Sequence, residues 1–176
     1  MHLKGAFYVT RPAWVKMREQ SYGRVINTSS NSGILGNFGQ SNYGAAKMGI
    51  VGLTRVLAAE GARYNIHVNA IAPAAATRMT ESVLTAEAAE ALDPSRVAPV
   101  VAWLAHPACE TTGEVISAGG GRVARYFIGL TPGYLSRKLT IENVRDHWEE
   151  ARNVVEFIVP QHPSEEMELF MKQWTA

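Results

Sequence analysis

Short apolar runs alternate with helical stretches along this chain, and that alternation limits the folds open to it. The runs at 24–28, 66–72 and 114–118 are followed by small residues, glycine or proline, and each predicts a strand. Strands separated by helices form a parallel sheet layered between helices. The sequence therefore predicts an α/β fold in which three strands can be recognised.

Four stretches have apolar residues at helical spacing. We predict helices at 3–20, 42–64, 94–104 and 139–157. Pro12 lies inside the first and predicts a kink or a restart, because proline removes a backbone hydrogen bond. The second helix is apolar on more than one face, so we expect it to be covered on two sides.

Two other segments are predicted to be a loop and a lid. Three glycines predict a loop over 31–42. The alanine-rich, polar segment 74–92 is expected to form a mobile lid over a substrate.

Three polar residues are predicted to meet where the first strand ends. Tyr43 and Lys47 are four residues apart and share one helix face, and Ser30 closes the apolar run before them. Free tyrosine, with a pKa of about 10, is a weak base at neutral pH, and a neighbouring ammonium favours the phenolate form. The trio therefore predicts proton transfer with a substrate hydroxyl group that Ser30 orients. Tyrosine and lysine at this spacing, taken alone, more often mark an interface and a solvated face.

Three motifs in order resemble the short-chain dehydrogenase/reductase family. They are Val-Ile-Asn-Thr-Ser-Ser at 25–30, Tyr-Gly-Ala-Ala-Lys at 43–47 and Asn-Ala-Ile-Ala-Pro at 69–73. A narrower similarity, to the (3R)-3-hydroxyacyl-CoA dehydrogenase unit of type 2 peroxisomal multifunctional enzymes and its bacterial relatives, lies in 36–43, 71–81 and 144–148.

The resemblance implies that the chain is the carboxyl-terminal half of a doubly wound, Rossmann-type parallel-sheet domain. Residues 1–125 would be a partial dinucleotide-binding domain, and 126–176 its helical extension. The chain would begin inside an internal helix of the family and lack the strands that hold the adenosine end of the cofactor. The first strand would then have an unpaired edge.

The resemblance also implies an activity and residue roles. The chain would interconvert a secondary alcohol, here a 3-hydroxyacyl-CoA, and a ketone, with NAD as the cofactor and NADP left open. Tyr43 would be the general base, Lys47 would favour its phenolate and bind the nicotinamide ribose, and Ser30 would hold the substrate oxygen. Tyr43 would thus also lie against the cofactor.

Further residues would complete the cofactor pocket by the same resemblance. Pro73, Ala74, Ala76 and Thr77 would contact the nicotinamide carboxamide and the pyrophosphate. The family usually has glycine at the position of Ala74, so the freedom of that backbone is reduced. His2 stands where many members have an asparagine whose backbone carbonyl takes part in a proton relay.

The segment 119–124, Gly-Gly-Gly-Arg-Val-Ala, fits the dinucleotide fingerprint G-x-G-x-x-A, with Glu142 about 20 residues further on. We reject that interpretation, because 126–133 is not predicted to be a helix and no strand–helix–strand unit follows. By the resemblance, this run closes the last strand beside the substrate.

The composition excludes several kinds of partner. A net charge of +1, without a basic stripe, gives no reason to expect nucleic acid or an anionic membrane. No apolar run reaches the roughly 18 residues of a membrane span. The single cysteine, Cys109, allows no internal disulfide and fits a reducing compartment. The histidines show no ligand spacing, so we predict no metal. We expect a cytoplasmic location, or a peroxisomal one in a eukaryote.

A second interpretation is that the chain is a non-catalytic fragment or an association module. In the family, the helices corresponding to 3–20 and 42–64 pair across a dimer axis, so the resemblance implies a homodimer through them.

Overall fold

The computed structural model of the protein describes residues 2–78 and 84–175. The lid predicted over 74–92 therefore lies partly outside the described residues. The chain divides into two compact units, residues 1–126 and 127–176, and each is described by itself.

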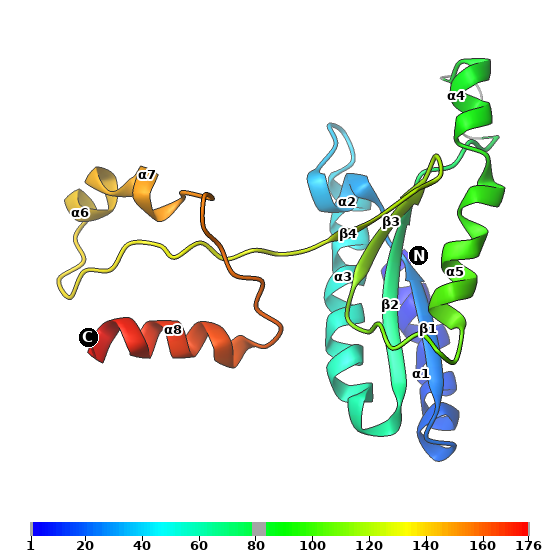
Figure 1. The fold of residues 1–176 in the computed structure, drawn as a ribbon, viewed down its shortest axis with the longest axis horizontal. Coiled ribbons are helices and arrows are strands. Elements are labelled where there is room, and N and C mark those ends of the chain that lie inside the picture. The colour runs from blue at the N-terminus through cyan, green and yellow to red at the C-terminus, as the bar shows by residue number, and fades with distance from the viewer. Residues whose placement is uncertain (1, 79–83, 176) are drawn as a thin grey trace. The chain divides into compact units, whose positions relative to one another are not determined.

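The first unit contains a four-stranded sheet in the order β1-β2-β3-β4 (Figure 1). The first three strands, β1 (Gly23–Thr28), β2 (Ile66–Pro73) and β3 (Val115–Gly119), are parallel and confirm the three predicted strands. The fourth, β4 (Arg122–Tyr126), pairs antiparallel with β3 and was not predicted. Its side chains are mostly exposed, so it lacks the apolar pattern of a buried strand.

A glycine hairpin joins β3 and β4. Gly120 and Gly121 have φ of 58° and 77°, a conformation that glycine adopts without strain. No helix separates the two strands. The sequence 119–124 therefore forms a hairpin, which was not predicted, and the rejection of the dinucleotide fingerprint agrees with this.

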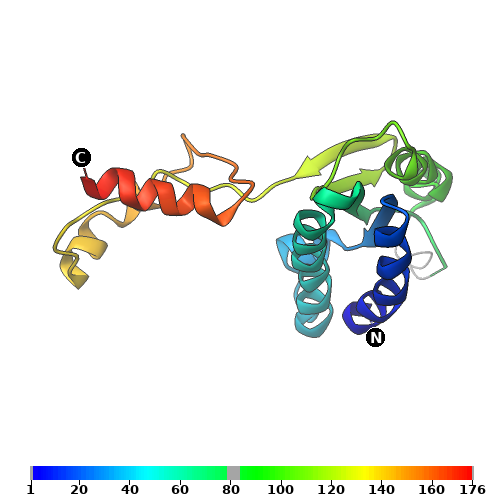
Figure 2. The ribbon, with the colours of Figure 1, turned by 90° about the horizontal axis from the view of Figure 1, so that it is seen from below.

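Helices cover both faces of this sheet. The long helices α1 (His2–Glu19) and α3 (Ser41–Gly61) lie side by side on one face, and α5 (Ala98–Ala105) lies on the other (Figure 2). Helix α1 is continuous through Pro12. Two short 3-10 helices, η1 (Ala62–Tyr64) and η2 (Pro94–Arg96), follow α3 and precede α5.

Two short helices fall where the sequence analysis predicted loop or polar segments. Helix α2 (Asn31–Leu35) lies at the start of the predicted loop 31–42, and α4 (Ala86–Ala91) lies in 74–92. A side-chain cap starts each of them: Ser30 accepts from the Ser32 N–H, and Thr85 accepts from the Ala88 N–H. One capped turn is too short to produce a periodic pattern, so apolar spacing could not reveal either helix.

The core follows the alternation of side chains along the strands. On the α5 face, Ile71 and Ile116 pack with Leu104. On the α1–α3 face, Ile66 and Val68 are fully buried. Their neighbours there, among them Trp14, Met17, Leu57 and Ala58, come from α1 and α3. Helix α3 therefore packs against the sheet on one side and against α1 on another.

The described residues of the second unit form three helices and little sheet. They are α6 (Ile141–Asp146), α7 (Trp148–Ala151) and α8 (Pro163–Thr175). The prediction of one helix over 139–157 was wrong in extent. The structure has two short helices there, which are separated at His147, and the second ends at Ala151. Helix α8 was missed, although the sequence has proline at its first position, Pro163, and a glutamate in its first turn, Glu165. In the structure the Glu165 side chain accepts from the His162 N–H.

Candidate functional site

The candidate site lies at the carboxyl end of β1. Thr28 ends the strand, and the Ser29 N–H continues the ladder by donating to the Ile71 carbonyl at 2.7 Å. Ser30 follows, partly buried, and its hydroxyl accepts from the Ser32 N–H at 3.2 Å and donates to the Asn31 side chain at 3.3 Å. The candidate substrate-orienting hydroxyl is therefore fixed as a helix cap where strand becomes helix.

Lys47 is the buried cation of this region. Only 7% of its surface is exposed, and its Nζ donates to the Thr28 carbonyl at 2.8 Å. The same Nζ lies 5.6 Å from the centroid of the Tyr43 ring. Tyr43 and Lys47 are both in α3, one turn apart, so strand end and helix together place an ammonium beside a phenol ring.

Two neighbours of Lys47 escaped the sequence analysis. Ser29 is 2% exposed, and its hydroxyl donates to the Lys47 carbonyl at 2.8 Å. Gly33, in α2, lies so close that a Cβ there would sit 2.6 Å from the Lys47 Cβ. The doubled serine at a strand end was the available signal for Ser29. Nothing in the sequence indicates that Gly33 contacts Lys47.

The segment after β2 continues the sheet before leaving it. Pro73 pairs with Ala118, the Ala74 N–H donates to the Ala118 carbonyl at 2.8 Å, and the Ala76 N–H donates to the Leu92 carbonyl at 2.7 Å. A Cβ on Gly119 would lie 2.5 Å from the Ala74 carbonyl oxygen, so glycine permits this close approach. Thr77 follows and is exposed.

His2 also reaches the site. Its ring meets the Tyr43 ring edge-on, with centroids 5.6 Å apart. His2 is exposed and lies in the first turn of α1. The position that the resemblance assigned to a proton relay is thus beside Tyr43.

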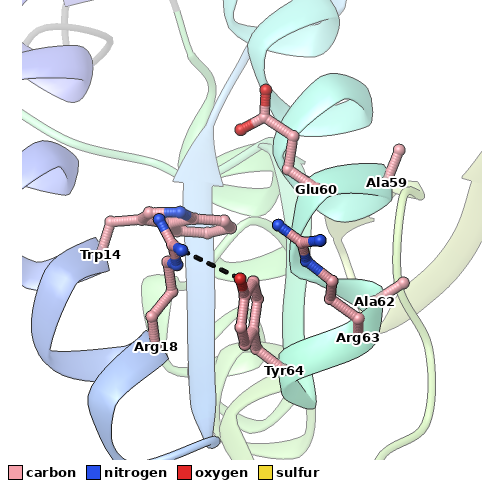
Figure 3. A pocket seen from close by; sticks show the side chains of 7 residues that line it. All are labelled: Trp14, Arg18, Ala59, Glu60, Ala62, Arg63 and Tyr64. Atoms are coloured by element: carbon pink, nitrogen blue, oxygen red, sulfur yellow. Dashed lines mark hydrogen bonds between the residues drawn. The ribbon is translucent and has the colours of Figure 1, made fainter.

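A hollow lies at the opposite end of α3. It has a volume of about 530 Å³, and its lining includes Trp14 and Arg18 from α1 and Glu60, Arg63 and Tyr64 from the end of α3 and η1 (Figure 3). Arg18 donates to the Tyr64 hydroxyl at 2.9 Å. None of the sequence-predicted site residues lines this hollow.

Other features of the described residues give no second site. No group of three or more His, Cys, Asp or Glu side chains within 2–78 and 84–175 is placed to hold a metal ion. Among the described helices, none combines the length and the apolar character that crossing a membrane requires. Cys109 is a free, buried thiol.

Known proteins share both the sequence and the fold. A family model described as short chain dehydrogenase matches residues 1–88. The peroxisomal multifunctional enzyme type 2 of Mus musculus is 52% identical over 153 residues, which are 85% of this chain and 21% of that protein. An acetoacetyl-CoA reductase of an Acinetobacter species is 42% identical over 131 residues, 68% of this chain and 53% of that protein.

A solved structure agrees with these relatives. The full-length peroxisomal multifunctional enzyme type 2 of Drosophila melanogaster superimposes with a TM-score of 0.89 and 39% identity, over 97% of this chain and 32% of that one. The chain thus spans about half the length of the bacterial relative and about a fifth of the mouse protein. The shared motifs, the sheet and these similarities show that the chain belongs to the short-chain dehydrogenase family.

Proposed function

We propose that the chain carries the proton-transfer part of an oxidoreductase that interconverts a (3R)-3-hydroxyacyl-CoA and a 3-ketoacyl-CoA. The observation that carries this proposal is Lys47, an ammonium buried between the Thr28 carbonyl and the Tyr43 ring. Burying a charge costs several kcal/mol unless it is paired or bonded, so a lysine in this place needs a reason. Promoting ionisation of Tyr43 is such a reason.

Each residue of the trio has one task in this proposal. In the direction of oxidation, the phenolate oxygen of Tyr43 takes the hydroxyl proton as the carbonyl forms. In the direction of reduction, the phenol returns that proton. Lys47 favours the phenolate by its charge, and the Ser30 hydroxyl orients the substrate oxygen toward Tyr43. Without substrate, the Ser30 hydroxyl donates to Asn31 and accepts from Ser32, so its one proton must turn from Asn31 to bind a substrate carbonyl oxygen.

A nicotinamide cofactor fits part of this site. When bound, it would accept or supply the hydride at the reacting carbon. An ammonium has three N–H donors, and one of those on Lys47 binds Thr28, so Lys47 can also bind ribose hydroxyls. Ala76 can donate to a carboxamide only after its bond to Leu92 opens. We propose NAD, with NADP as the alternative, and contacts also from Pro73, Ala74 and Thr77.

The relatives support the substrate class. The name of the Acinetobacter protein specifies a coenzyme A thioester with a ketone two carbons from the thioester carbon. The enzymes of mouse and Drosophila are named as peroxisomal. We therefore propose an acyl-CoA substrate, and a cytoplasmic or, in a eukaryote, a peroxisomal location.

Binding and turnover test this function in order. NADH titrated into the purified chain should raise nicotinamide fluorescence saturably, and a 3-hydroxyacyl-CoA with NAD should then produce NADH. Turnover of the (3R) but not the (3S) substrate is expected. Binding without turnover of either would refute the substrate, and absence of binding would refute catalysis by this chain alone.

A second candidate function is association of two chains through α1 and α3. Helix α1 has no buried residue within the first unit, and its exposed apolar side chains include Phe7, Val9 and Val15, at 51%, 73% and 53%. On α3, Val56 is 56% exposed. Such side chains favour a partner surface, and the proposed partner is a second copy of the chain.

Sedimentation tests the association. The chain should sediment as a dimer, and Val9→Glu should convert it to a monomer, because a charge in an apolar interface is costly. Val155→Glu, in the second unit, is the control and should leave the dimer intact, because the Val155 side chain is as exposed as that of Val9. A parent that is monomeric at high concentration would contradict this proposal.

A further inference from the structure

Ser29 has a contact that the proton-transfer roles do not explain. Its hydroxyl donates to the Lys47 carbonyl at 2.8 Å, and its own N–H donates to Ile71 in β2. It is 2% exposed, so it is closed to substrate, whereas the neighbouring Ser30 caps α2. One residue thus joins β1, β2 and α3 at the turn of α3 that carries Lys47.

The contacts of Lys47 complete a three-point support. The Thr28 carbonyl accepts from its Nζ, the Ser29 hydroxyl holds its carbonyl, and Gly33 lies against its Cβ. Both ends of the lysine are therefore bonded to consecutive residues of one strand end. A lysine side chain held in one place loses rotamer entropy, and the contacts with its neighbours must offset that cost.

We propose that Ser29 is a positioning residue that fixes Lys47 against Tyr43 by holding the backbone of Lys47 to the end of β1. Without this bond the first turns of α3 are free to shift along the strand end. The bond from Nζ to Thr28 then lengthens, and the ammonium leaves its place beside the Tyr43 ring. Ser29 acts only through Lys47 and does not touch substrate. The consequence for turnover rests on the proposed function, but the geometry does not.

Chemical labelling of the Lys47 amine tests the geometry without substrate or cofactor. Acetic anhydride should acetylate Lys47 slowly in the parent, and the side chain of Lys16, 76% exposed, serves as the internal reference. Ser29→Ala should raise the relative rate at Lys47 by about threefold to tenfold, as expected from the loss of one hydrogen bond. Mass spectrometry of the peptide containing Lys47 measures this rate.

The matched control is Thr54→Val. Thr54 is also fully buried in α3, and its hydroxyl accepts from the Asn27 amide at 3.0 Å, two turns beyond Lys47. This variant loses a comparable bond between α3 and β1 but leaves the support of Lys47 intact. Equal acceleration in both variants would mean that general loosening exposes Lys47, and would overturn the proposal.

Gly33→Ala is the second variant, and it keeps the test valid if Ser29→Ala fails to fold. Its added Cβ presses on Lys47 from α2, so it should also accelerate labelling. Unchanged labelling in the folded variants would refute the three-point support.

In an active parent, Ser29→Ala should lower kcat by about threefold to tenfold with an unchanged KM for the hydroxyacyl substrate. A raised KM with unchanged kcat would show that Ser29 acts on substrate binding instead. If no variant and no parent turns over, the proposed function fails, while the labelling result still decides the role of Ser29.

Discussion

The two ends of α3 hold positive charge in opposite ways. Near its amino end, Lys47 is 7% exposed and its ammonium is bonded to a backbone carbonyl. At its carboxyl end, the guanidinium groups of Arg18 and Arg63 are exposed and lie 4.7 and 4.8 Å from the centroid of the Tyr64 ring. The first end buries one cation, and the second leaves two in water beside a hollow of about 530 Å³.

The difference lies in how the positive charge is compensated at each end. Exposed arginines can stack on an aromatic ring at little cost, because water still solvates their charge. A buried ammonium has no such compensation, and here its neighbours are strand-end groups and a phenol ring. The proposed proton transfer is therefore placed at the end where the charge is less solvated.

Replacing the phenol at the buried end should have the largest effect. Tyr43→Phe removes the group that exchanges the proton, and general acid–base catalysis is typically worth about 10²- to 10⁴-fold. We expect kcat to fall by that factor while NADH still binds, as measured by fluorescence. Undiminished turnover in the variant would show that another group exchanges the proton.

A packing change at the opposite end should separate stability from chemistry. In Gly61→Ala the new Cβ would lie 2.5 Å from the Ile66 carbonyl oxygen, so the backbone must shift. We expect the free energy of unfolding, measured with urea, to fall by about 1–3 kcal/mol. The rate per folded molecule should stay at the parental value, since Gly61 lies at the far end of α3 from Tyr43.

Gly52 supplies the matched control for that change. It lies in the same helix, and nothing stands within 4 Å of a Cβ built there. Gly52→Ala should therefore stabilise the chain by up to about 1 kcal/mol, through helix propensity alone. Equal destabilisation by both substitutions would contradict the packing explanation.

The buried end of α3 was largely accessible to sequence reasoning, whereas the exposed end was not. Tyr43 and Lys47 share a helix face through their spacing alone, and the apolar run before Ser30 predicts a strand end. The stacking of Arg18 on Tyr64 brings together residues 46 positions apart. No local pattern predicts such a contact.

The missed elements have the same explanation. Strand β4 and helix α2 are stabilised by pairing and by a cap, not by a periodic apolar face. The role of Ser29 depends on a hydrogen bond to a backbone carbonyl 18 residues away. Periodicity predicts which face of an element is buried. It does not predict which partner a buried polar group will find.

The smallest effect is expected at the exposed end. Tyr64→Phe removes the hydroxyl that accepts from Arg18 but keeps the ring under both guanidinium groups. Because this hydrogen bond is exposed, its loss should cost about 0.5 kcal/mol or less in the free energy of unfolding. NADH binding and turnover should not change. A large loss of either would show that the hollow takes part in the reaction, and that solvated charge, like buried charge, can mark a functional end of this helix.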